Sequence, residues 1–302
     1  MCVIAVTMFS ASATLLAQGA TCRSSVFATT LDPKTNEPID GLAASDFRAT
    51  LKRHELSIRS VTAAPTARRF VFVLDRSGSM KNAQNGSLRP DLVNQALRDA
   101  VAEIPSGDTV ALLAFAGKHN ARTEFMRPAS ALAGLQAMLA WKPTPETKPE
   151  RTPLWDNVDA ALRMLSPQQR GDVIVLVTDG GDNMSKLRPV DVRNELLQAG
   201  VPMLAILAED PSASTPEERM GLAALLDLAE ATGGVVTSVP GRNSELSSKQ
   251  VIALLAHQYE LEIGVPPIRK LTEWQLSLKS AANGRKPTLF YPHYLPPCAS
   301  TQ

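Results

Sequence analysis

Aromatic side chains are scarce in this chain of 302 residues, in which Phe, Trp and Tyr together make up 5%. Proteins that bind single-stranded nucleic acids or sugars stack their ligands on aromatic rings, so this scarcity argues against a stacking platform. Charge of one sign is not in excess either, because 31 basic and 30 acidic residues give a formal net charge of +1 at pH 7. A nearly neutral chain offers no electrostatic footprint for a polyanion, and we expect no nucleic-acid partner.

Catalytic signatures are missing as well. The chain contains no Gly-x-x-x-x-Gly-Lys-Ser/Thr string, which excludes a phosphate-binding P-loop. The four histidines share no spacing typical of a zinc site. No two carboxylates can be assigned as a general acid and a general base. We therefore expect a binding protein and not an enzyme.

Long apolar runs are confined to the N-terminus, so we expect no membrane span. Residues 3–17 carry no charge and are small and apolar, and Ala17-Gln18-Gly19 offers small residues at cleavage spacing. The run is too short to cross a bilayer comfortably. These features predict a signal peptide over residues 1–19 and a secreted or periplasmic protein. No Lys or Arg precedes the apolar run, which leaves the true start codon open and keeps a buried first strand as the alternative.

Cysteine is limited to three residues. Cys2 would leave with the signal peptide, and Cys22 and Cys298 would remain, one near each end of the chain. An even pair in an oxidising compartment favours a disulfide, and the alternative is two unpaired surface thiols. On the loop-entropy model a bridge that closes nearly the whole chain would stabilise the fold by about 4–5 kcal/mol.

Two buried strands end in polar residues that suit a cation. The apolar run 70–74 leads into Asp75-Arg76-Ser77-Gly78-Ser79, and the apolar run 173–177 leads into Thr178-Asp179-Gly180-Gly181. Ligand sites in open α/β sheets lie at the carboxyl ends of strands, so these side chains are expected to converge. Carboxylate and hydroxyl oxygens suit Mg²⁺, Mn²⁺ or Ca²⁺ and not zinc or copper. Phosphotransferases with an aspartate nucleophile carry a second Asp where this chain has Ser77, so binding is favoured over catalysis.

With Thr152, these segments resemble the metal-ion-dependent adhesion site of von Willebrand factor A domains in its D-x-S-x-S … T … D form, and the likeness covers about residues 69–264. The resemblance implies that Ser77 and Ser79 donate hydroxyl oxygens to the ion. It implies that Asp75 and Asp179 supply charge, often through coordinated waters, and that Thr152 binds directly in the ligand-competent state. It also implies a divalent cation, Mg²⁺ before Mn²⁺ or Ca²⁺, and a protein partner that presents Asp or Glu.

The middle of the motif departs from the family pattern. Thr152 is normally preceded by Gly, whereas Arg151 precedes it here, inside a Pro-rich loop. Thr144 and Thr147 are therefore alternative ligands. Asp182 and Asn183, which follow the glycines, are expected to shape a turn or cap a helix.

The segment 69–257 alternates strands and helices, which predicts a doubly wound, mostly parallel six-stranded α/β sheet. Residues 123–126 are expected to form the short antiparallel partner of the strand 109–115. The remaining predicted strands are 173–178, 201–208 and 235–238, and the predicted helices are 91–102, 132–141, 154–165, 190–199, 216–232 and 245–257.

Alternating segments flank this region on both sides, over residues 23–64 and 258–298. Gly41-Leu42-Ala43-Ala44-Ser45-Asp46-Phe47 resembles the L-x-x-x-D-F element that heads bacterial VWFA-related domain proteins, a family described mainly from Acidobacteria. That resemblance implies a small β domain built from both ends of the chain, which would bring Cys22 and Cys298 together. The predicted strands are 25–30, 47–51, 56–61, 258–263, 274–279 and 289–294.

Two functions are compatible with this reading. The first is an exported, metal-dependent binding or adhesion module that engages a protein partner through the partner's carboxylate. The second is a von Willebrand factor A partner of a MoxR- or chelatase-type ATPase, with a role in assembly or metal insertion. The apparent signal peptide and the flanking β segments favour the first.

Overall fold

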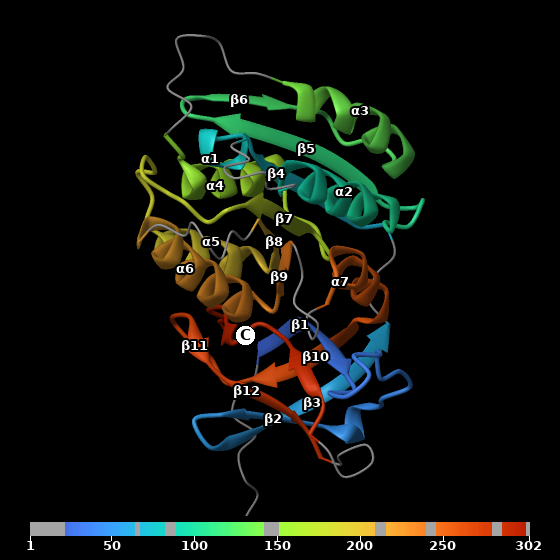
Figure 1. The fold of residues 1–302 in the computed structure, drawn as a ribbon. Coiled ribbons are helices and arrows are strands. Elements are labelled where there is room, and N and C mark those ends of the chain that lie inside the picture. Colours follow the sequence, from blue (N-terminus) through green and yellow to red (C-terminus); the bar gives the residue numbers. More distant parts are fainter. Residues whose placement is uncertain are drawn as a thin grey trace, which may run out of the picture.

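The computed structural model describes residues 22–63, 67–81, 89–141, 151–208, 216–239, 246–279 and 286–299. The described chain forms an α/β unit and, beside it, an antiparallel β unit in which strands from both ends of the chain pair (Figure 1). The signal peptide predicted for residues 1–19 lies outside the described residues.

The α/β unit is built on a six-stranded sheet with the order β6-β5-β4-β7-β8-β9. Each neighbouring pair is parallel except β5 and β6, so the predicted doubly wound, mostly parallel sheet is confirmed. Central strand β4 is buried along most of its length, which explains why it reads as an apolar run. The strands are β4 (Arg69–Asp75), β5 (Thr109–Ala116), β6 (His119–Arg122), β7 (Val173–Thr178), β8 (Met203–Ala208) and β9 (Val236–Val239).

Helices cover both faces of this sheet (Figure 1). Alternate residues of β4 point to opposite faces: Phe70 and Phe72 pack into a core with α2, α3 and α7, and Val71 and Val73 into a core with α4, α5 and α6. No helix in the described ranges is both long and apolar enough to cross a membrane. The helices are α1 (Gly78–Lys81), α2 (Arg89–Ala102), α3 (Pro128–Ala140), α4 (Leu154–Met164), α5 (Pro189–Ala199), α6 (Pro216–Thr232), α7 (Ser248–Leu254) and the 3₁₀ turn η3 (Leu255–His257).

The antiparallel partner of β5 was predicted in the wrong place. It is β6 and not residues 123–126, because Gly117 adopts a positive φ of 56° and reverses the chain within two residues, so that Ala116 pairs with His119. The strand is polar and largely exposed, which hides it from an apolar pattern. The predicted segment still runs beside β5, where Met126 forms an isolated bridge with Val110.

The β unit is a six-stranded antiparallel sheet with the order β12-β2-β3-β10-β1-β13. N-terminal β1 pairs with β10 from the far end of the chain, so the predicted β domain from both termini is confirmed. The strands are β1 (Cys22–Leu31), β2 (Phe47–Leu51), β3 (His54–Ala63), β10 (Tyr259–Val265), β12 (Gln275–Leu278) and β13 (Thr288–Phe290), and β11 (Thr272–Glu273) pairs separately with β14 (Tyr294–Leu295).

The strand predicted over residues 289–294 is in fact divided. It ends as β13 at Phe290 and resumes as β14 at Tyr294. Pro292 has no N–H to offer a sheet, and its carbonyl instead accepts a hydrogen bond of 2.6 Å from Trp274 Nε1. The His293 N–H donates to the carbonyl of Ala231 in α6 at 2.8 Å. This interruption therefore joins the β unit to the α/β unit.

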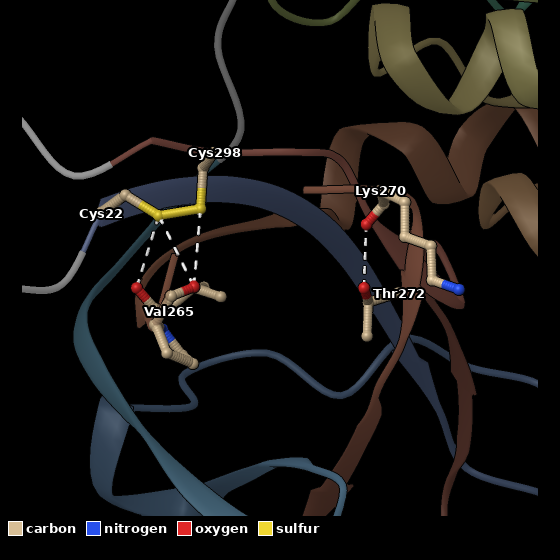
Figure 2. The surroundings of a disulfide bond; sticks show 6 residues. Cys22, Val265, Lys270, Thr272 and Cys298 are labelled. Carbon is tan, nitrogen blue, oxygen red and sulfur yellow. Dashed lines mark hydrogen bonds between the residues drawn. A yellow bond between two sulfur atoms is a disulfide. The ribbon is translucent and has the colours of Figure 1, made fainter. Parts of the chain in front are cut away.

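A disulfide between Cys22 and Cys298 closes the β unit, as Figure 2 shows. The two Cα atoms are 6.2 Å apart although the residues are separated by 276 positions in sequence. The Cys22 Sγ lies 3.4 Å from the carbonyl oxygen of Val265 in β10. The predicted pairing is thus confirmed. Cys22 pairs with Val265 at the end of β10, and Cys298 forms an isolated bridge with Ile268, which follows β10 closely in the sequence.

Candidate metal centre

The two polar segments lie side by side because their strands do. β4 and β7 are parallel neighbours with Leu74 opposite Val177, so Asp75 and Thr178 emerge at the same edge of the sheet. The Thr178 Oγ1 donates a hydrogen bond of 2.8 Å to Oδ2 of Asp75. The sheet order thus brings together residues that are 103 positions apart in sequence.

Asp75 is buried, with 2% of its surface exposed. Its Oδ1 accepts a hydrogen bond of 2.9 Å from the Ser77 N–H. Burial, and after it the negative charge of nearby Asp179, raise the pKa of Asp75 to about 7, against the opposing effect of the hydrogen bonds from Ser77 and Thr178. Two carboxylates at this edge thus repel each other in the absence of a positive charge.

The segment after β4 presents two hydroxyl groups to the same edge, Ser77 from the loop and Ser79 from α1. Ser77 is buried and Ser79 is exposed, and their Oγ atoms are 3.1 Å apart. The loop is held to β5 by the Arg76 N–H, which donates to the Phe115 carbonyl at 2.8 Å. The Arg76 side chain instead donates to the carbonyl of Leu139 at the end of α3.

Asp179 carries the most informative atom of the site. Its Oδ1 accepts a hydrogen bond of 3.1 Å from the Gly181 N–H, but its Oδ2 is buried and has no hydrogen-bond partner among the described residues. A buried carboxylate oxygen without a partner is costly, and native proteins satisfy such atoms with a donor, a water or an ion.

Thr152 is held at this edge by the segments that flank β4. The Thr152 N–H donates to Oδ1 of Asn183 at 2.8 Å, and the Asn183 N–H donates back to the Thr152 carbonyl at 3.2 Å. On the other side the Gly117 N–H, just past β5, donates to the Arg151 carbonyl at 2.9 Å. Thr152 therefore lies between the segments that follow β5 and β7, which are the two neighbours of β4. Thr144 and Thr147, the alternative ligands, lie outside the described residues.

The residues after the glycines build the frame of the site. Asp182 Oδ1 accepts hydrogen bonds from the N–H groups of Met184 and Ser185, which shapes the turn. The Ser185 Oγ accepts hydrogen bonds from the N–H groups of Trp155 and Asp156 in the first turn of α4. The sequence predicted a turn or cap here, but it did not reveal that Asn183 braces Thr152 or that Thr178 bonds to Asp75.

The donor set fits a hard divalent cation. Within the described ranges no three His, Cys, Asp or Glu side chains form a metal-binding group. The candidate ligands predicted from the sequence are two carboxylates and three hydroxyls. These are Asp75, Asp179, Ser77, Ser79 and Thr152. Oxygen-only donors match Mg²⁺, Mn²⁺ or Ca²⁺, and a cation would satisfy Oδ2 of Asp179 and offset the repulsion between the carboxylates.

Cation affinity is expected to fall in mildly acidic solution. In the cation-free protein the pKa of Asp75 is raised to about 7, so a cation must displace a proton below that pH. With one proton displaced, affinity should fall about eightfold between pH 7.5 and pH 6. Calorimetric titration with Mg²⁺ across this range measures the effect. An affinity that stays constant over this range would contradict the prediction that the cation displaces a proton from Asp75.

Comparison with known proteins agrees with this fold. Residues 70–182 match the family described as von Willebrand factor type A domain. The chain therefore contains a von Willebrand factor type A domain, and the match ends just after the second polar segment of the candidate metal centre. None of the curated proteins matches the chain in sequence.

Solved structures resemble the chain at low identity. Proximal thread matrix protein 1 from the mussel byssus is 19% identical with a TM-score of 0.47, over 66% of this chain and 48% of that one, so this chain spans about half its length. An aerotolerance-related membrane protein from Bacteroides fragilis is 16% identical with a TM-score of 0.46, over 63% and 98%. A von Willebrand factor type A structure from Catenulispora acidiphila is 14% identical with a TM-score of 0.44, over 90% and 73%.

Proposed function

We propose that this protein is an exported binding module that holds a divalent cation, Mg²⁺ in the first place, and engages a protein partner through the partner's Asp or Glu. The observation that carries the proposal is the buried Oδ2 of Asp179, which has no hydrogen-bond partner among the described residues. A cation bound there would be the missing partner of that oxygen.

The balance of charges in the candidate metal centre supports a role in binding. Two carboxylates neutralise a divalent cation, but Asp75 shares its charge with hydrogen bonds from Ser77 and Thr178. The remaining donors are uncharged hydroxyls, so the cation would remain electrophilic and would keep exchangeable water. A partner's carboxylate can replace such a water and bring charge to charge. We assign the site a role in binding and no catalytic step.

The disulfide bond of the chain supports export. The Cys22–Cys298 disulfide is typical of proteins in oxidising compartments, and it agrees with the predicted signal peptide over residues 1–19. We therefore place the module outside the cytoplasm, in the periplasm or the extracellular medium.

Calorimetric titration with Mg²⁺ and Mn²⁺ tests the proposal. The wild-type protein should bind both ions saturably, and Asp179→Asn should weaken binding by about a hundredfold or more, since it removes a charge next to the ion. Asp227→Asn is the matched control, because Asp227 lies exposed on α6 and should leave the affinity within about twofold. Equal affinity in wild type and Asp179→Asn would refute the proposed site.

The partner's carboxylate can be tested with the Mn²⁺-loaded protein. A short acetylated peptide with one central Asp should displace a bound water and lower the water-proton relaxation rate that Mn²⁺ causes. The same peptide with Asn in place of Asp should leave that rate unchanged. If both peptides act alike, the cation does not recognise a carboxylate, although the metal site itself would stand.

A further inference from the structure

Two adjoining cavities lie away from the candidate metal centre, where the β unit meets the α/β unit. One has a volume of about 340 Å³ and lies between β1 and the end of α5, and the other, of about 490 Å³, lies between α5 and residues 269–271. They share Leu197, Gln198, Tyr294 and Pro297 in their walls and are called here the interdomain groove. None of the five candidate metal ligands lines it.

An open strand edge forms one wall of the interdomain groove. Five consecutive residues of β1, from Arg23 to Phe27, line it. β10 pairs with β1 from Cys22 to Ala28, but β13 pairs on the other side only from Thr29 to Leu31. Among the described residues no strand pairs with the second edge of β1 before Thr29, and backbone groups there make no hydrogen bond outside the ladder with β10.

Such an edge is a template for another strand. Along an antiparallel pair, the N–H and C=O groups of alternate residues point away from the partner, so part of the backbone of residues 23–27 faces the groove. Extended peptides bind other proteins by adding to an edge of this kind, and the backbone hydrogen bonds provide the affinity. The length of the open edge suits a segment of about five or six residues.

The charge of the interdomain groove indicates what kind of segment fits. Among the described residues that line it, every charged one is basic: Arg23, Arg170, Arg193, Arg269 and Lys270. The first three already form ion pairs, with Glu262, Glu260 and Asp227 respectively. Arg269 and Lys270 have no ion pair with any described residue, so their charge is available to a ligand.

We infer that the interdomain groove binds an extended, acidic peptide segment of a partner protein, which adds as a strand to the open edge of β1 while its carboxylates face Arg269 and Lys270. Acidic side chains complement a groove whose described wall residues include no Asp or Glu. The chain's own N-terminal run is a poorer occupant, because residues 3–17 carry no charge. The disulfide fixes the groove, since Cys298 lines it and Cys22 begins β1 (Figure 2).

Fluorescence anisotropy with labelled peptides tests the inference on the full chain. The probe is an acetylated hexapeptide that alternates Val and Glu, and EDTA is present so that the metal centre plays no part. The probe should bind, and a Val–Lys peptide of the same length should bind at least about tenfold more weakly. A Val–Glu peptide that is N-methylated at alternate residues on its pairing edge should lose binding to a similar degree, because it cannot donate to β1.

Charge-reversal variants test whether the basic residues of the groove recognise the peptide. Arg269→Glu with Lys270→Glu should weaken the Val–Glu peptide by about tenfold, whereas the control pair Lys34→Glu with Lys52→Glu, on exposed residues elsewhere, should change it by less than about twofold. If the N-methylated peptide binds as tightly as the unmethylated one, the ligand does not add as a strand to β1. If the double variant of Arg269 and Lys270 binds the Val–Glu peptide like the wild type, the groove does not select an acidic ligand. Absence of peptide binding overturns the whole inference. This holds even if the open edge of β1 is instead covered by residues 1–21 or by a second copy of the chain.

Discussion

Replacing Gly221 with Ala should weaken cation binding by about tenfold or more, although Gly221 contributes no ligand to the candidate metal centre. A Cβ at position 221 of α6 would lie 1.6 Å from the carbonyl oxygen of Gly180. Because that contact is with backbone, either α6 or the segment after β7 must move. Gly180 follows Asp179 directly, and its N–H donates at 3.0 Å to the Thr178 hydroxyl that bonds to Asp75. A shift of Gly180 therefore displaces both carboxylates of the site.

Calorimetric titration with Mg²⁺ and thermal unfolding without the ion together test this prediction. Overpacking of this kind should lower the free energy of unfolding by about 1–3 kcal/mol even in the cation-free protein. Gly134→Ala is the matched control, since an added Cβ in α3 would have nothing within 4 Å. It should leave cation affinity unchanged and stabilise α3 by about 0.5–1 kcal/mol. If Gly221→Ala binds Mg²⁺ like the wild type, α6 does not position the site.

The sheet was predictable because its strands are buried on both faces. A strand such as β4 must be apolar throughout to pack against helices on either side, and this leaves an unmistakable run in the sequence. Exposed β6 carries no such requirement, and its position depended on the conformation of Gly117. The break between β13 and β14 depended on contacts of Pro292 and His293 with residues far away in sequence. Local patterns contain none of these determinants.

In the candidate metal centre, too, the local sequence predicted some features, and others depend on contacts between distant residues. Asp75, Ser77, Ser79 and Asp179 were recognisable because each follows a buried strand, and parallel neighbours end at one edge. The sequence alone could not show which strands are neighbours, so the bond from Thr178 to Asp75 was not predicted.

The surroundings of Thr152 and Asp179 depend on tertiary packing. Asn183 was expected to shape a turn or cap a helix, yet its side chain accepts a hydrogen bond from the Thr152 N–H, a contact between residues 31 positions apart. The close approach of Gly221 to Gly180 joins α6 to the loop after β7. Neither feature leaves a periodic signal. The ligand types were thus accessible from sequence, whereas the supports that hold them required the fold.

Replacing both Cys22 and Cys298 with Ser should lower the free energy of unfolding by about 3–5 kcal/mol. The disulfide joins residues separated by 276 positions, so it restricts nearly the whole unfolded chain. In the folded state it ties β1 to the segment after β14, and β1 pairs with β10 from Cys22 to Ala28 and with β13 from Thr29 to Leu31. Without the bond, the β unit should open at lower denaturant concentration than the α/β unit.

Hydrogen exchange resolved by segment distinguishes this from a general loss of stability. Protection should fall in β1 and β10 and remain in β4 and β7, which lie in a separate sheet with its own cores. Reduction of the wild-type protein should produce the same change, and reductant should have no further effect on the Ser variant. A loss below about 1 kcal/mol, or equal loss of protection in both sheets, would contradict the prediction, because in the folded state both cysteines belong to the β unit.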